Sequence, residues 1–195
     1  MSEGYAIRRA TLDDVPILVA HRRGMFEAMG YADREALAAM DAGFAEWVRE
    51  KLIAEEYVGW FAVDPDGSVA CGVGVWLLDW PPTASDPTRP RAYVLNMFTE
   101  GAHRRGGLAR RLMRDVLAWC RAKGIRTVVL HASDSGRPLY DSLGFEPTNE
   151  MRLTLSEVRG RRTTGPRRAP GRPSRRRPAR ARSPQARGRP RVRPR

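Results

Sequence analysis

The stretch from 93 to 123 constrains the fold most, because its apolar pattern changes there from the period of a strand to the period of a helix. Residues 93–99 are a short run of β-forming and apolar residues, which predicts a strand. From Leu108 to Cys120, apolar residues recur every three or four positions, which predicts an amphipathic helix that ends at Gly124. The central unit of the fold is therefore a strand that leads through one loop into a helix.

The loop in the middle of this unit has the features of an anion site. Its sequence is Arg104-Arg105-Gly106-Gly107, and the helix begins directly after it. Glycines let the backbone turn tightly and approach a ligand, and the first N–H groups of a helix have no acceptor within the helix. Together with the helix dipole and the two arginines, these groups predict a phosphate site. The residues match neither a Walker loop nor the G-x-G-x-x-G fingerprint of dinucleotide-binding folds.

Two short motifs, in the expected order, resemble the GNAT superfamily of N-acetyltransferases. Arg104, Gly107 and Ala109 match the Arg-x-x-Gly-x-Ala of its pyrophosphate loop, and Tyr140 to Phe145 match its Tyr-x-x-x-Gly-Phe helix end. The ordered pair is more specific than either motif alone. The resemblance covers roughly residues 5–155. It implies an acyltransferase that moves an acetyl group from acetyl-coenzyme A (acetyl-CoA), without a metal, directly to a primary amine of a small molecule or peptide.

Over its whole length, the pattern predicts an α/β (α+β) fold with a mixed central sheet and flanking helices, in the order β-α-α-β-β-β-α-β-α-β. The resemblance, more than periodicity alone, makes this a GNAT-like fold. Gly43 marks a candidate bend in the second helix, and the stretch 81–90 is a loop rich in proline, threonine and aspartate. The predicted strands are 5–10, 57–63, 68–80, 93–99, 126–130 and 151–155, and the predicted helices are 11–29, 33–56, 108–123 and 135–143.

The resemblance also implies a cofactor site, in the cleft where strands 93–99 and 126–130 separate at a β-bulge. An N–H near Met97 would polarise the thioester carbonyl. Tyr140 would act as the general acid for the departing thiolate, although a tyrosine between Leu139 and Leu143 also suits a core. Ser133 would bond the pantetheine arm. The remaining cofactor contacts would be main-chain groups of Met97, Phe98 and Thr99 and the pyrophosphate loop residues Arg104, Arg105, Gly106, Gly107, Leu108 and Ala109.

The acceptor site and the general base are less defined. The family places the acceptor between the first two helices and the loop before strand 93–99, which points to Met25, Phe26, Met29, Trp76 and Trp80; core packing explains each of them equally well. Asn96 either faces the substrate or bonds the bulged backbone. The candidates for the base are Glu27, Glu100, Glu150, His103 and His131.

The last 40 residues differ from the rest in composition. Residues 156–195 contain 16 arginines and a single acid, Glu157, whereas the preceding residues are slightly acidic overall. We expect an acetyltransferase domain at 1–155 and a disordered Arg/Pro-rich tail at 156–195. The tail supports an alternative function, non-specific nucleic-acid binding, but it has no aromatic residue for base stacking. It also has the composition that G/C-rich codons give in a wrong frame, so an out-of-frame extension is the third explanation.

The two cysteines, Cys71 and Cys120, lie in apolar surroundings and in no metal or redox spacing, which predicts buried free thiols and a reducing compartment. The first ten residues lack the apolar core of a signal peptide, and no apolar run approaches the ~18 residues of a membrane span. We therefore expect a cytoplasmic protein that does not bind membranes. Its oligomeric state stays open, with a homodimer among the options.

Overall fold

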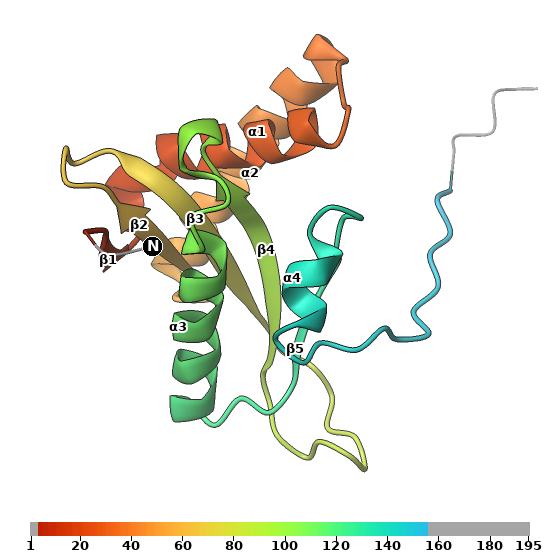
Figure 1. Cartoon of the computed structure of the whole chain (residues 1–195). Helices are drawn as coiled ribbons and strands as arrows, with labels where there is room; N and C mark the ends of the chain where they lie inside the picture. Colours follow the sequence, from red (N-terminus) through yellow and green to blue (C-terminus); the bar gives the residue numbers. More distant parts are fainter. Residues whose placement is uncertain (1–3, 156–195) are drawn as a thin grey trace, which may run out of the picture. The chain divides into compact units, whose positions relative to one another are not determined.

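A computed structural model describes residues 4–155 of the chain (Figure 1). The chain divides into two compact units, 1–148 and 149–195. The first unit contains every helix and strand found in the described residues. The predicted tail at 156–195, and with it the observation behind the nucleic-acid alternative, lies outside the described residues.

The sheet has five strands, which lie across it in the order of the sequence. The first four strands are mutually antiparallel, and the fifth is parallel to the fourth. The fifth strand is parallel to the fourth because the chain crosses over between them through one helix. The mixed sheet confirms the predicted fold class. The strands are β1 (Ala6–Arg9), β2 (Tyr57–Val63), β3 (Val69–Leu78), β4 (Arg91–Thr99) and β5 (Val128–Leu130).

Helices cover both faces of the sheet (Figure 1). Two of them, α1 and α2, pack on one face, and α3 crosses the other. The helix α2 continues without a break through Gly43, the candidate bend. The helices are α1 (Val15–Ala28), α2 (Arg34–Ile53), α3 (Leu108–Ala122) and α4 (Arg137–Asp141), with short 3-10 turns η1 (Leu12–Asp14) and η2 (Gly101–His103).

The apolar stripe of α3 holds that helix against the sheet. Leu112, Met113 and Val116 are completely buried there. Burial of side chains of this size contributes about 1.5–3 kcal/mol each, so the stripe fixes the position of α3 and of the loop before it. On the opposite face, the Asp33 side chain caps α2 by accepting hydrogen bonds from two backbone N–H groups of its first turn.

The predicted strand at 151–155 is wrong, because these residues form no secondary structure. Met151, Leu153 and Leu155 alternate with polar residues as in a strand, yet they are 94%, 82% and 85% exposed. A period of two becomes a strand only where another strand completes its hydrogen bonds, and none of the described strands pairs with this segment. The helix predicted at 135–143 is also shorter, with only the five residues of α4. In the described part of the chain no helix is apolar over a length that could cross a bilayer.

Candidate functional site

The strands β4 and β5 separate after a short paired stretch. The last paired residues are Val94 and Leu130, so β5 leaves the rest of β4 open on that side. A bulge lies where the separation begins: Leu95 faces Gly74 and Phe98 faces Gly72, so two residues of β4 oppose one residue of β3. Asn96 adopts a left-handed conformation there, with φ of 55°. The expected bulge and separation are both present, and Met97, Phe98 and Thr99 lie on the open part of β4.

The loop before α3 forms a concave backbone at the start of the helix. Arg105 and Gly107 are left-handed, with φ of 63° and 83°, and Gly107 is the N-cap of α3. Such alternation turns successive N–H groups toward one point, where the positive end of the helix dipole adds to them. Arg104, Arg105 and Gly107 are exposed. The Nε of Arg104 donates to the carbonyl of Thr99 at 3.0 Å, which ties the loop to the end of β4.

Tyr140 projects from α4 into the core on the α3 side of the sheet. It is 8% exposed, and the ring of Phe145 meets it edge-on at 5.8 Å. Burial raises the pKa of Tyr140 to about 12, and the nearby Cys71 thiol adds to the rise. The Ser133 hydroxyl accepts a hydrogen bond from the Gly136 N–H at 3.2 Å and so stabilises the turn before α4. Its predicted contact with pantetheine stays a prediction.

A buried polar cluster lies on the other face of the sheet, at the bulge. The side-chain oxygen of Asn96, a residue only 3% exposed, accepts from Nη1 of Arg22 at 2.7 Å. The Asn96 amide in turn donates to the hydroxyl of Tyr57 at 3.4 Å. Burial raises the pKa of Tyr57 to about 12. Asn96 thus links α1 and β2 through two side-chain hydrogen bonds at the bulge, rather than through the bulged backbone, and its role toward the acceptor stays a prediction.

Sequence reasoning did not select Arg22 or Tyr57, although a signal for Arg22 exists. Val15 and Leu18 are buried on α1, and Arg22 follows at the spacing that continues the same face. A charged residue on the buried face of an amphipathic helix is unusual and calls for an explanation. Tyr57 gives no such signal, because a tyrosine at the start of an apolar strand is ordinary.

The predicted acceptor residues do not all lie together. Phe26 and Trp76 lie near the polar cluster: the Arg22 guanidinium is 5.2 Å from the Phe26 ring and 4.7 Å from that of Phe44, and ring contacts run on through Trp47 to Trp76. Met29 is 44% exposed at the end of α1, and Trp80 is 41% exposed after β3. Met25 is half-buried on α1.

Of the five candidate bases, two have polar partners on other elements or on their own helix, and a third lies outside the first unit. Glu27 pairs with Arg23, His103 lies 2.8 Å from the Tyr5 hydroxyl, and Glu150 belongs to the second unit. The other two directly follow the separating strands: Glu100 follows β4, and His131 follows β5. His131 directly follows the last paired residue of β5, with Nδ1 2.6 Å from the Tyr93 hydroxyl.

Glu100 lies after β4, with Oε1 3.6 Å from Nε2 of His21. His21 is a residue that sequence reasoning missed, and it is only 3% exposed. Burial lowers the pKa of His21, and the Glu100 charge partly opposes this change. Burial therefore favours the neutral form of this imidazole, whose ring also lies 5.3 Å from the Phe98 ring.

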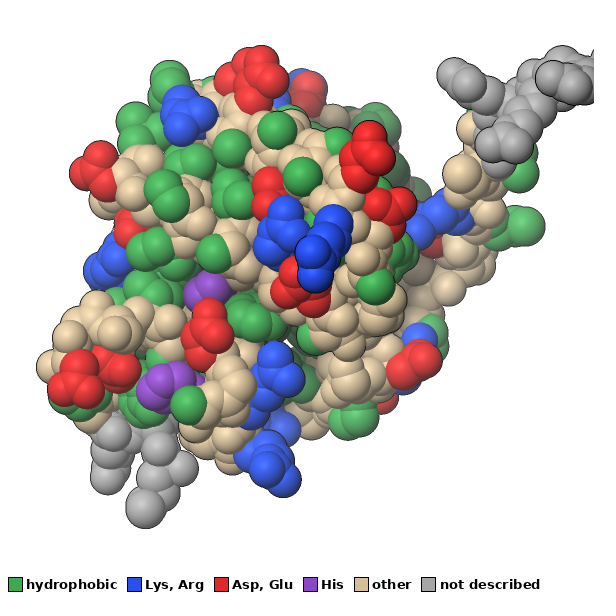
Figure 2. All heavy atoms as spheres, turned by 90° about the horizontal axis from the view of Figure 1, so that it is seen from above, with side chains coloured by type: hydrophobic (Ala, Val, Ile, Leu, Met, Phe, Trp, Pro, Cys, Tyr) green, Lys and Arg blue, Asp and Glu red, His purple; other side chains and the backbone are tan. Residues whose placement is uncertain are grey.

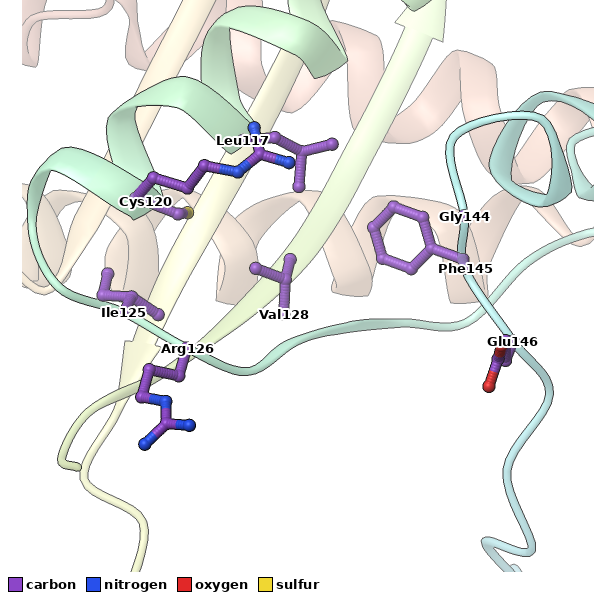
Figure 3. Close-up of a pocket in the computed structure, with 9 residues that line it drawn as sticks. Leu117, Cys120, Ile125, Arg126, Val128, Gly144, Phe145 and Glu146 are labelled. Carbon is purple, nitrogen blue, oxygen red and sulfur yellow. The ribbon is translucent and has the colours of Figure 1, made fainter. Parts of the chain in front are cut away.

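Two hollows open elsewhere on the first unit. One, of about 370 Å³, lies between the end of α3, the start of β5 and the segment after α4 (Figure 3). Leu117, Val128 and Phe145 form its apolar side, and Arg126 and Glu146 lie at its rim. It is at the end of β5 opposite the separation from β4. The other, of about 500 Å³, lies beside Trp76 and the loop before β4.

One face of the described surface carries side chains of both charges. In Figure 2, basic, acidic and hydrophobic side chains are interspersed on the face that is seen from above. Within the described residues, no group of three or more His, Cys, Asp or Glu side chains is placed to hold a metal ion. Cys71 and Cys120 are buried free thiols, as expected, and burial raises the pKa of each to about 11.

Comparisons with known proteins agree on one family. The model of the acetyltransferase (GNAT) family matches residues 23–145. A GCN5-related N-acetyltransferase from Ralstonia eutropha JMP134 is 35% identical, and the match covers 78% of this chain and 99% of that one with a TM-score of 0.73. A predicted acetyltransferase from Clostridium acetobutylicum, crystallised with acetyl-CoA, is 26% identical over 78% of this chain and 96% of that one, with a TM-score of 0.71. Human N-acetyltransferase 8 is 36% identical over 70 residues, 33% of this chain, and the match spans 31% of that protein's length.

Proposed function

Because the chain belongs to the acetyltransferase (GNAT) family, we propose that it transfers the acetyl group of acetyl-CoA directly to a primary amine of a small molecule or peptide. The observation that carries the proposal is the separation of β4 from β5 at the bulge, together with the concave loop at the start of α3. An open strand edge can bond an extended amide chain, and a helix start with left-handed residues can bind a pyrophosphate.

The residues present would fit acetyl-CoA at two places, the loop before α3 and the open part of β4. Main-chain N–H groups from Arg105 to Ala109 would hold the pyrophosphate, and the exposed Arg105 charge would add to them. The open part of β4, from Met97 to Thr99, would bond the pantetheine amides. Acetyl-CoA supplies an activated acyl group on a thiol leaving group. An N–H near Met97 would donate to the carbonyl oxygen and stabilise the negative charge that develops there.

The buried state of Tyr140 refines its predicted role. Its pKa of about 12 lies above the ~8.5 of an ordinary thiol, so full proton transfer from the hydroxyl to a thiolate is uphill. A hydrogen bond from the hydroxyl to the sulfur needs no such transfer and stabilises the departing thiolate. We therefore assign Tyr140 the role of a hydrogen-bond donor, and solvent supplies the proton.

His131 is the proton acceptor that we propose for the amine. It lies where β4 and β5 separate, and the Tyr93 hydroxyl fixes its ring through Nδ1. In the tautomer that is protonated at Nδ1, this proton would point at the Tyr93 oxygen, and Nε2 would be the atom that accepts a proton from the ammonium group. Glu100 lies on the other side of the bulge and already faces His21.

The test is acetyl-CoA turnover by the full chain, measured as release of free thiol with a panel of primary amines. We expect amine-dependent thiol release and acetylated product by mass spectrometry. Gly107→Glu, which places a carboxylate in the proposed pyrophosphate site, is the control and should lower the signal strongly at limiting acetyl-CoA. Thiol release that does not depend on any amine, or that is the same in Gly107→Glu, would contradict the proposal.

A further inference from the structure

Arg22 is a partly buried cation without an acidic partner among the described residues. Its Nε is buried and has no hydrogen-bond partner, and its one hydrogen bond runs from Nη1 to Asn96. The adjacent Arg23 shows the ordinary solution, because its guanidinium meets Asp41 at 2.6 Å and Glu27 at 3.7 Å. Removing a charge from water is costly unless an opposite charge compensates for it, so Arg22 lacks an anion.

The surroundings of Arg22 fix it in place. The aromatic rings of Phe26 and Phe44 lie 5.2 Å and 4.7 Å from its guanidinium, and Asn96 holds Nη1. A guanidinium has five N–H donors, so several stay available after this one bond. A planar, immobilised guanidinium binds carboxylates well, because it can donate two parallel hydrogen bonds with little loss of side-chain freedom.

The position of Arg22 relates it to the acceptor. Asn96, its hydrogen-bond partner, is the bulge residue directly before Met97, where the acetyl group would lie. An anion bound to Arg22 is thus close to the attacking amine. In an α-amino acid the carboxylate is two bonds from the nitrogen, whereas in a peptide it is many bonds away. The ring contacts from Phe44 through Trp47 to Trp76 add an apolar surface next to this point.

We propose that Arg22 binds the carboxylate of the acceptor, and that the acceptor is a free α-amino acid with an apolar or aromatic side chain. This inference rests on the proposed acetyl transfer to a primary amine. Burial lowers the pKa of Arg22, as expected for a cation that awaits a counter-charge. The guanidinium keeps its charge at neutral pH all the same.

The first experiment compares each amino acid with its decarboxylated amine: phenylalanine with phenethylamine, and leucine with 3-methylbutylamine. A charge-assisted hydrogen bond of this kind changes kcat/KM by about 10- to 100-fold, so we expect the wild-type protein to prefer the amino acids by that ratio. Arg22→Met should bring the ratio close to one, and Arg22→Lys should keep part of it. Arg23→Gln, which removes the same charge from the next position of α1, should leave the ratio as in wild type.

The ratio is independent of any general loss of activity that follows from the lost Asn96 bond. Equal or better turnover of the decarboxylated amines by the wild-type protein would overturn the proposal, and so would an unchanged ratio in Arg22→Met. Binding of N-acetylphenylalanine, measured by isothermal calorimetry, tests the carboxylate site without turnover. Binding that exceeds that of N-acetylphenethylamine and is lost in Arg22→Met supports the site even if no amine is acetylated, whereas equal binding of the two compounds refutes it.

Discussion

A substitution at Gly107 separates the charge of the proposed pyrophosphate site from its shape. Gly107 has φ of 83°, it is exposed, and a Cβ added to it would meet no atom within 4 Å. A longer side chain therefore fits without a clash, and its only local cost is the left-handed conformation, about 1–2 kcal/mol. Gly107→Gln and Gly107→Glu share this cost and nearly the same bulk, so they differ in one negative charge.

The size of the difference follows from Coulomb's law. A unit charge about 4 Å from another contributes about 1 kcal/mol in a water-like environment, which suits an exposed position. The two charges of a pyrophosphate would thus cost about 2 kcal/mol, and the Kd for coenzyme A should be about 30-fold higher in Gly107→Glu than in Gly107→Gln. Added salt should reduce this ratio, because it screens exposed charges.

Isothermal calorimetry with coenzyme A gives both Kd values, and a thermal melt verifies that each variant folds. Both variants should lose a similar few degrees of Tm, since both have the same backbone cost. A Gly107→Glu protein that binds coenzyme A as tightly as Gly107→Gln, at low salt, would refute the assignment of the phosphate to this loop. The result would then point to a different part of the surface for the anion.

Three further predictions follow from individual contacts. Tyr140→Phe should lower kcat by about 10- to 150-fold, the value of a hydrogen bond to a charged group, with little change in the Kd for coenzyme A; unchanged kcat where chemistry limits the rate would remove the hydroxyl from the mechanism. Gly74→Ala should destabilise the fold by about 1–3 kcal/mol in urea titrations, because the new Cβ would overlap the buried Tyr57 hydroxyl. Gly43→Ala is the control: a Cβ at this position of α2 meets open space, so the substitution should be neutral or stabilising. Arg8 holds the pKa of Asp14 at about 2, below the usual 3.8, so this carboxylate stabilises the fold above about pH 4, and the contribution is lost as the pH falls toward 2. Asp14→Asn should therefore flatten the plot of unfolding free energy against pH between these values. An unchanged plot would contradict the role of the pair.

The sequence by itself determined the order of the elements as far as α4 and the loop that precedes α3. Local rules suffice for these features: the period of the apolar residues gave β2 over its full length and α3 within a residue, and the glycines before Leu108 allow the left-handed turn that α3 begins with. The bulge and the separation of β4 from β5 came from the family resemblance, since neither leaves a mark in the residues of one strand.

Only the tertiary structure decided which side chains surround the proposed acetyl-transfer point. Arg22 and Asn96 are 74 positions apart, and they meet because α1 packs over the bulge of β4. The same applies to the segment 151–155, whose apolar alternation is that of a strand although no described strand pairs with it. The period of the apolar residues shows which face of an element is apolar. Strand pairing and burial depend on which other elements pack against that face.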